Sequence, residues 1–209
     1  MACLNGCSTQ DAAAPTPEAV NIDSYNADQE AIAKAEGLKL VNYDLNRDGK
    51  PDIYKFFRVI TDDPKLLGTK VLVRKEIDLN HDGRIDVVKL YDDKQEVREE
   101  RTDLDFDGRL DEHSFFAAGK LVRQEIDLNY DGQPDVIRYF KSDRLEHLEA
   151  DRNSDGHIET WEYYEGDELD RVGVDLNNDG VVDRWERKHA EAPKADATPD
   201  DTQPDAAKE

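Results

Sequence analysis

A nine-residue pattern, written D-x-[N/D]-x-D-G-x-x-[D/E], occurs six times in this chain of 209 residues. The copies begin at Asp44, Asp78, Asp103, Asp127, Asp151 and Asp175. Each copy has oxygen-bearing side chains at positions 1, 3, 5 and 9, and a glycine at position 6, where the backbone must turn sharply. Recurrence at a nearly fixed spacing predicts a repeat array with one such loop in each repeat.

This arrangement of oxygens is typical of calcium-binding loops. A hard divalent cation that takes about six to eight oxygens needs short carboxylates and amides from alternate residues, with a backbone carbonyl at position 7. The predicted Ca²⁺ ligands at positions 1, 3, 5 and 9 are Asp44, Asn46, Asp48 and Asp52; Asp78, Asn80, Asp82 and Asp86; Asp103, Asp105, Asp107 and Asp111; Asp127, Asn129, Asp131 and Asp135; Asp151, Asn153, Asp155 and Glu159; and Asp175, Asn177, Asp179 and Asp183. The predicted carbonyl ligands at position 7 are Lys50, Arg84, Arg109, Gln133, His157 and Val181.

The last two loops differ from the others at position 12, where a complete EF-hand places a bidentate carboxylate. Glu162 and Glu186 occupy this position and are predicted ligands, so loops five and six are expected to bind more tightly. The first four loops carry Lys55, Lys89, Ser114 and Arg138 there. Their ions would be completed by water or by a glutamate two residues before a loop, such as Glu76, Glu125 or Glu149.

An alternative interpretation is that these segments are only Asp/Asn-Gly turns, since such residues favour turns without any metal. That reading accounts for the glycines. It leaves the recurring acid at position 9 unexplained, because carboxylates crowded into nine residues repel one another without a counter-ion.

The residues between the loops alternate in the manner of half-buried strands. Positions 11 and 13 are apolar or aromatic in most repeats, as at Tyr54 and Phe56, and an apolar residue stands six places before the next loop, as at Leu72. The loop starts lie 34, 25, 24, 24 and 24 residues apart, and a segment of about 24 residues supplies two strands rather than a four-stranded propeller blade. The predicted fold is all-β: an elongated antiparallel β-hairpin repeat array, β-solenoid-like, with the loops along one edge and the aromatic stripe as core. The longer first interval predicts an enlarged hairpin loop over 60–70.

Four regions are predicted along the chain. Residues 1–23 would form an N-terminal tether and residues 24–40 a short capping helix, with Ser24 or Asn26 as its N-cap and Gly37 as its stop. Residues 41–189 would form the six-loop calcium-binding domain. Residues 190–209, rich in Ala, Asp, Pro and Lys, are predicted to be a disordered acidic tail.

The charge balance limits the class of partner. The formal net charge is −22, and no Lys/Arg-rich stretch rises above the acidic background, so nucleic-acid binding is not expected. The chain contains no run of eighteen apolar residues, which is the length that a membrane-spanning helix needs. The segment ending in Leu4-Asn5-Gly6-Cys7 resembles the end of a bacterial lipoprotein signal, and membrane attachment is expected only through lipidation of Cys7.

The loop sequences resemble those of several calcium-binding families. DLNRDGKPDIY and DLNYDGQPDVI are similar to the loops of EF-hand and dockerin proteins, thrombospondin type 3 repeats and FG-GAP/VCBS repeats, and the hairpin rhythm is similar to MORN-like repeats. As a whole, residues 41–189 resemble the acidic calcium-loop repeat lipoproteins of gliding and predatory delta-proteobacteria. The resemblance implies a cell-envelope location, as an outer-membrane lipoprotein or in the periplasm, or at the cell surface, and no defined activity.

The function expected from the sequence is therefore a non-enzymatic, calcium-rigidified scaffold that binds envelope or surface proteins. The alternative is a calcium-dependent adhesin or glycan-binding protein that uses Trp161, Tyr163, Tyr164 and Trp185. No enzyme is expected, because no nucleophile stands with a base and the five histidines fall in different repeats.

Overall fold

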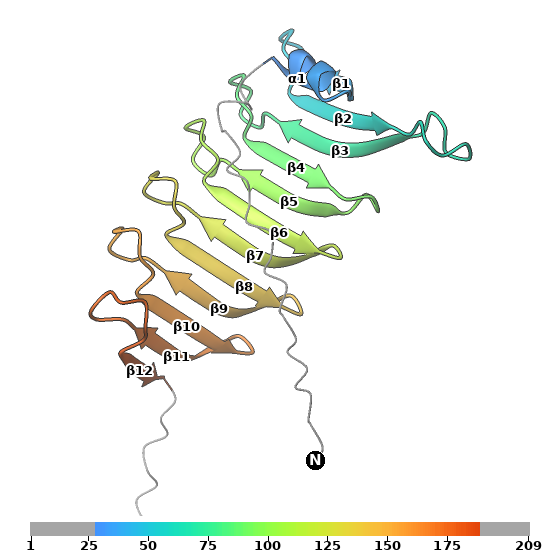
Figure 1. Ribbon diagram of the computed structural model, residues 1–209. Helices are drawn as coiled ribbons and strands as arrows, with labels where there is room; N and C mark the ends of the chain where they lie inside the picture. Colours follow the sequence, from blue (N-terminus) through green and yellow to red (C-terminus); the bar gives the residue numbers. More distant parts are fainter. Residues whose placement is uncertain (1–27, 189–209) are drawn as a thin grey trace, which may run out of the picture. The chain divides into compact units, whose positions relative to one another are not determined.

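The computed structural model describes residues 28–188 (Figure 1). The chain divides into two compact units, residues 1–119 and residues 120–209. The predicted tether, the lipidation site at Cys7 and the predicted acidic tail lie outside the described residues.

Both units are built almost entirely from antiparallel strands. The first unit contains α1 (Gln29–Ala35), β1 (Lys39–Tyr43), β2 (Ile53–Val59), β3 (Lys70–Ile77), β4 (Val87–Tyr91), β5 (Val97–Thr102) and β6 (Glu112–Ala117). The second contains β7 (Lys120–Ile126), β8 (Val136–Lys141), β9 (Arg144–Ala150), β10 (Thr160–Glu165), β11 (Glu168–Val174) and β12 (Arg184–Arg187). Within each unit the strands are hydrogen-bonded in chain order and the sheet does not close. The predicted all-β hairpin array with one short helix is confirmed.

The helix α1 begins and ends at residues that favour those positions. Asp28 is its N-cap, and the Asp28 carboxylate accepts hydrogen bonds from the backbone N–H groups of Glu30 (3.0 Å) and Ala31 (3.4 Å). The predicted cap at Ser24 or Asn26 is therefore wrong, because a competent acceptor lies closer to the first turn. Gly37, with φ of +67°, ends the helix as predicted.

A recurring irregularity explains why most outgoing strands carry two large side chains in a row. The pairing shifts between the two residues, as between Phe56 and Phe57 or Tyr163 and Tyr164. Because of the shift, the second residue pairs with the apolar residue six places before the next loop. The observed pairs are Phe57 with Leu72, Tyr91 with Val97, Phe140 with Leu145, and Tyr164 with Leu169. Two consecutive aromatic residues can thus both meet a cross-strand partner.

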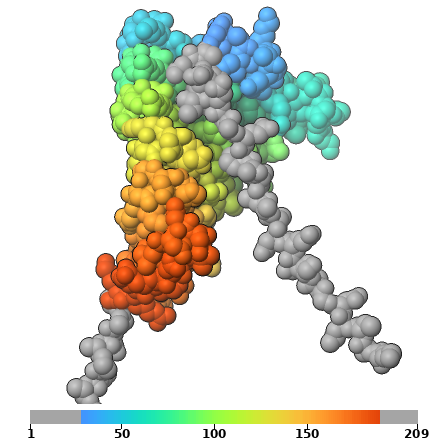
Figure 2. Space-filling view, turned by 60° about the vertical axis from the view of Figure 1, so that its left-hand side comes forward, coloured from blue at the N-terminus to red at the C-terminus, as the bar shows by residue number. Residues whose placement is uncertain are grey.

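The first hairpin carries the enlarged loop that its spacing predicts. The loop runs between Val59 and Lys70, and backbone N–H groups of Ile60 and Gly68 bond to Thr69 and Ile60 carbonyls at 2.9 Å. In Figures 1 and 2 the hairpin of β2 and β3 extends beyond the turns of the neighbouring hairpins in the first unit.

The apolar core of the described residues is thin. The buried apolar side chains are Ala33, Phe56, Ile85, Val87, Val88, Ile126, Ile137 and Ala150. Buried acidic residues outnumber these apolar ones by nine to eight: Asp52, Glu76, Asp78, Asp86, Asp103, Asp111, Asp135, Asp151 and Asp175. All except Glu76 come from the repeated loops, so the loops are the most unusual feature of the burial pattern.

Candidate metal centres

Each loop is a closed ring of nine residues. The N–H of the position-9 residue donates to the carbonyl of the residue just before position 1, at 2.8–3.2 Å in all six loops. Asp52 and Tyr43 close the first loop in this way, and Asp183 and Val174 close the last. The strands that flank a loop are therefore held together where the loop begins.

The acid at position 1 organises the turn inside the ring. Its Oδ2 accepts a hydrogen bond from the N–H of the position-6 glycine at 2.7–3.0 Å in all six loops. In five loops its Oδ1 also accepts from the N–H of position 4, at 2.6–2.8 Å. These glycines have φ values of +80° to +95°, which an L side chain rarely adopts, so the sequence needs glycine at this position.

The other oxygen-bearing side chains hold the rest of the ring. Position 3 accepts from the N–H of position 5 at 2.8–3.1 Å, and position 5 accepts from the N–H of position 7 at 2.8–3.0 Å. One oxygen of position 9 accepts from the N–H of position 2 at 2.5–2.9 Å. These hydrogen bonds hold all four side chains against the backbone of the loop and leave further oxygen lone pairs for a ligand.

Within each unit, successive loops are linked to each other. The N–H of position 1 donates to the carbonyl of position 9 in the preceding loop, as from Asp78 to Asp52 (2.8 Å) and from Asp175 to Glu159 (2.9 Å). Asp52, Asp78 and Asp175 are buried at these contacts and Glu159 is half-buried, whereas Asp44 in the first loop and Asp183 in the last are exposed.

The arrangement leaves buried carboxylate oxygens without a partner. Asp86 is 1% exposed and Asp111 8% exposed, and the Oδ1 atom of each is buried with no hydrogen bond within the described part of the chain. The Oε2 atom of Glu159 is likewise buried with no hydrogen bond within the described part of the chain. All three are position-9 acids. In loop three, oxygens of Asp103, Asp105 and Asp111 lie within 4.8 Å of one another. A buried ionised carboxylate is costly unless a cation is close, so these residues fit a divalent ion.

The acid–base properties of these groups follow their surroundings. Burial raises the pKa of Asp86 and of Asp111, against the opposing effect of the backbone N–H groups that bond to them. The pKa of Asp52, in contrast, is lowered, first by its hydrogen bond with His81. A bound cation would reverse the effect at Asp86 and Asp111 because it favours the ionised form.

Substitution of Asp86 by Asn is expected to have opposite effects with and without calcium. In the metal-free protein at pH 7 the variant should be more stable by about 1–3 kcal/mol, because an unpaired buried charge is removed. An acid with a raised folded-state pKa destabilises the fold above that pKa, and the penalty disappears as the pH falls below its ordinary value. The advantage should therefore shrink from pH 7 to pH 4. In millimolar calcium the variant should be the less stable protein.

Thermal melts of the metal-stripped and calcium-loaded proteins would measure both effects. Asp62→Asn is the matched control, since it removes the same charge from an exposed loop position. An Asp86→Asn variant that shifts the melting temperature in one direction under both conditions would contradict an ion at this loop.

Contacts between loops also come from position 4, which the sequence analysis did not single out. This residue has φ of +57° to +65° in every loop, and in three loops its side chain contacts the preceding loop. His81 Nδ1 lies 2.8 Å from Asp52 Oδ1, Ser154 Oγ donates to Asp135 at 3.3 Å, and Asn178 Nδ2 donates to Asp155 at 3.0 Å. Position 4 carries Phe106 and Tyr130 in the two middle loops, so no recurring residue type signalled these contacts.

The two predicted position-12 ligands are engaged elsewhere. Glu162 accepts hydrogen bonds from Arg152 (2.6 Å) and from the Tyr164 hydroxyl (2.7 Å), and Glu186 forms an ion pair with Arg184 (3.0 Å). The strand that follows each loop, in place of the helix of an EF-hand, carries these side chains.

The glutamates two residues before a loop face the basic residues two places earlier in the same strand. Glu76 pairs with Arg74 (3.1 Å), Glu125 with Arg123, and Glu149 with His147 (3.8 Å). Burial raises the pKa of Glu76 to about 7, with Arg74 opposing the rise and Glu36 adding to it. These pairs account for the basic residues that recur four places before the loops.

A row of stacked side chains crosses the second unit. Arg123, Tyr139, His147, Tyr163 and Arg171 pair directly across successive strands. The ring of His147 stacks on Tyr139 (centroids 4.2 Å apart) and on Tyr163 (5.3 Å), and the Arg171 guanidinium lies 4.7 Å from the Tyr163 ring centre. The faces of these rings are thus covered by one another, as the prediction of a packed aromatic stripe requires.

Comparison with known proteins supports the calcium-loop motif. The family model described as "EF hand" matches residues 75–87, which contain the second loop. No curated protein matches the chain. A solved structure of an S. aureus TarM mutant in complex with fondaparinux, alpha-GlcNAc-glycerol and UDP is similar over 79% of this chain, at 11% identity and a TM-score of 0.25. This chain covers 26% of that one, and so low a TM-score carries no argument.

The fold and the loops together define a class: an antiparallel β-hairpin repeat protein with EF-hand-like calcium-loop motifs between its hairpins. No described helix is both long and apolar enough to cross a membrane.

Proposed function

We propose that the six loops bind Ca²⁺ and that the bound ions hold successive hairpins in register. The observation that carries the proposal is the set of buried position-9 oxygens without partners, on Asp86, Asp111 and Glu159. Turns that need no metal would place such acids in solvent, because burial without a counter-charge is unfavourable.

The ligands are the side chains at positions 1, 3, 5 and 9 and the carbonyl oxygen of position 7. When bound, the ion supplies positive charge between carboxylates that otherwise repel one another. Because positions 9 and 1 of neighbouring loops in the same unit are joined by a backbone hydrogen bond, an ion in one loop also restrains the next. Ions that bind only the folded array stabilise it by linkage.

Native mass spectrometry and calorimetry test the ion binding directly. We expect up to six calcium ions per chain, retained in millimolar calcium and released by a chelator. If the chain retains no calcium ions, the proposal is wrong and the loops are turns that need no metal.

The two position-12 glutamates give a second measurement. If Glu162 leaves Arg152 to bind an ion, Glu162→Gln should weaken one of the tighter sites by about tenfold, since a bidentate carboxylate is a major ligand. Glu186→Gln should behave in the same way at loop six. Glu165→Gln, at the exposed end of β10, is the control. Unchanged affinity in the Glu162 and Glu186 variants would assign both residues to their observed contacts.

The role proposed for the rigid array is a non-enzymatic scaffold for protein–protein interaction in the bacterial cell envelope or at the cell surface. Support comes from the open sheet, which offers two faces over many strands, and from loop acids that are already used to hold backbone N–H groups. The location rests on the resemblance of the repeats and of the Cys7 segment to envelope lipoproteins. Recovery of specific partners from envelope extracts in calcium, and their loss in chelator, would test the role.

The adhesin alternative receives less support. Sugar recognition by stacking needs free aromatic faces, and Tyr163 has one neighbour in His147 and others in Arg171 and Trp185. Trp185 is 49% exposed but lies 5.2 Å from the Arg171 guanidinium. Glycan-array binding that is lost on Trp185→Ala substitution would favour the alternative.

A further inference from the structure

The two ends of the repeat array are complementary halves of one hairpin. Each complete hairpin contains an outgoing strand that follows a loop and a return strand that precedes the next loop. β1 is a return strand, and its described strand partner is β2; β12 is an outgoing strand, and its described partner is β11. We propose that β12 of one molecule pairs with β1 of a second copy, so that the chain assembles head to tail.

The repeat predicts the register of this contact. In the complete hairpins, position 10 pairs with the residue one place before the next loop, as Thr160 with Val174, and position 13 pairs with the residue four places before it, as Tyr163 with Arg171. The same rule pairs Arg184 with Tyr43, Trp185 with Asn42, Glu186 with Val41 and Arg187 with Leu40.

The backbone of β12 is available for this pairing. The Lys188 N–H donates to the Asp170 carbonyl at 3.1 Å, which makes Arg187 and Arg171 a non-hydrogen-bonded pair. The N–H and C=O groups of Arg187, and by alternation those of Trp185, therefore point away from β11. All four β12 residues are exposed. Such an edge is a template for a further strand.

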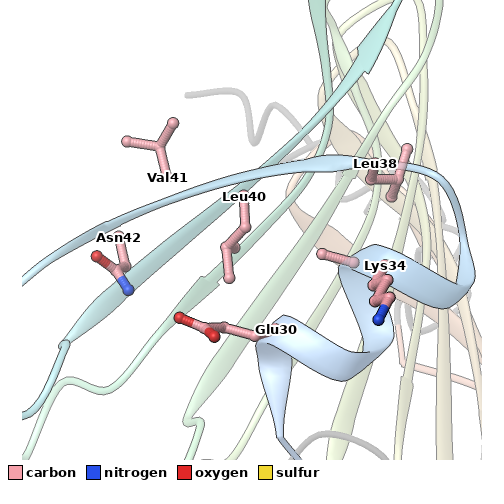
Figure 3. A pocket seen from close by; sticks show the side chains of 7 residues that line it. Glu30, Lys34, Leu38, Leu40, Val41 and Asn42 are labelled. Atoms are coloured by element: carbon pink, nitrogen blue, oxygen red, sulfur yellow. The ribbon is translucent and has the colours of Figure 1, made fainter.

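The edge at β1 has a groove that suits the side chains of β12. Figure 3 shows the groove, of about 550 Å³, between α1 and β1, with Leu40 directed toward the helix. Ala33, Leu38 and Leu40 give it an apolar lining, and Glu30 lies at its side. In the register above, Trp185 and Arg187 of the second copy project on this side of the strand. The indole ring would cover the apolar lining, and the guanidinium would meet Glu30.

The terminal loops carry matching groups as well. Inside the array, a position-1 N–H donates to a position-9 carbonyl and a position-4 side chain reaches the preceding loop. Asp44 and Asp183, exposed at the two ends, are the position-1 and position-9 residues that lack this contact. The position-4 residue of the first loop is Arg47, a cation that would approach the acids of loop six in the second copy. Charge and hydrogen bonding are therefore complementary at all three contacts: loop, strand and groove.

Sedimentation velocity of the full chain tests this assembly. Protein concentrations from about 5 μM to about 500 μM span the dissociation constants expected of a small strand-edge interface. We expect the average mass to rise with concentration and to pass beyond the dimer, because a heterologous contact does not close. Arg187→Pro removes an outward N–H, and Arg47→Glu reverses the loop charge, so each should raise the dissociation constant about tenfold or more. Lys94→Glu, at an exposed turn far from both edges, should leave it unchanged. A chain that stays monomeric at all concentrations overturns the proposal.

Disulfide trapping tests the register even if a variant associates weakly. With Cys3 and Cys7 replaced by Ser, Tyr43→Cys and Arg184→Cys proteins are mixed under oxidising conditions. These positions form a non-hydrogen-bonded pair in the proposed contact, close enough for a disulfide. A mixed dimer is expected for this pair and not for Lys39→Cys with Arg184→Cys. Equal trapping in both mixtures, or none at concentrations where the chain assembles, places the interface elsewhere. The proposed contact does not require a bound ion, so this outcome leaves the proposed ion binding intact.

Discussion

Removal of calcium by a chelator is expected to lower the melting temperature by tens of degrees, or to abolish the cooperative transition. One ion at a hundredfold excess over its dissociation constant stabilises the fold by about 2.7 kcal/mol, so six sites give an upper limit of about 16 kcal/mol. The whole free energy of unfolding of a typical domain is about 5–15 kcal/mol. The thin apolar core of this sheet cannot make up such a loss, since only eight apolar side chains are buried among the described residues.

Circular dichroism melts at matched ionic strength, in millimolar calcium and after metal removal, would measure this effect. Magnesium is the informative control, because it prefers a smaller octahedral shell with more water and should restore less stability. Identical melting curves with and without calcium would contradict both proposals, that the loops bind ions and that the ions make the array a rigid scaffold.

Substitution of Phe56 by Ala is expected to cost about 3–5 kcal/mol, the usual range for a buried phenylalanine. Phe56 is 0% exposed, and the guanidinium of Arg74 lies 3.9 Å from its ring centre. Arg74 in turn pairs with Glu36, just after α1. Loss of the ring would therefore remove the support of Arg74 and of the helix, as well as apolar burial.

Phe57→Ala is the matched control for this substitution. Phe57 is the next residue, it is only half-buried, and it pairs with Leu72 across the strand shift. Chemical denaturation in saturating calcium should give a loss about half as large or less for Phe57→Ala, since less surface is buried there. Equal losses of unfolding free energy for the two variants would mean that the contacts of Phe56 with Arg74 and, through it, with α1 add nothing to stability.

The six loops could be located from the sequence because their chemistry is local. The glycine at position 6 and the oxygen-bearing residues at positions 1, 3, 5 and 9 lie within nine residues, and the hydrogen bonds that use them close within the same loop. The enlarged first hairpin and the stop of α1 at Gly37 were predictable for the same reason. The cap at Asp28 was missed because several competent acceptors stand close together in that segment.

The contacts between repeats could not be read in this way. Nothing near His81 in the sequence indicates Asp52, 29 residues earlier, as its partner. The engagement of Glu162 by Arg152 and Tyr164 depends on the strand that replaces the EF-hand helix after the loop. The shift between Tyr163 and Tyr164 likewise depends on the register of two strands.

The sequence by itself determined the number of loops, their candidate ligand residues and the antiparallel hairpin rhythm, because each follows from residues that are neighbours in the chain. Only the tertiary structure decided which acids are buried and which oxygens, on Asp86, Asp111 and Glu159, are left without partners. Burial of a loop acid depends on the adjacent loop, about 24 residues away, being held against it by strand pairing. That long-range contact turns a series of acidic turns into candidate ion sites.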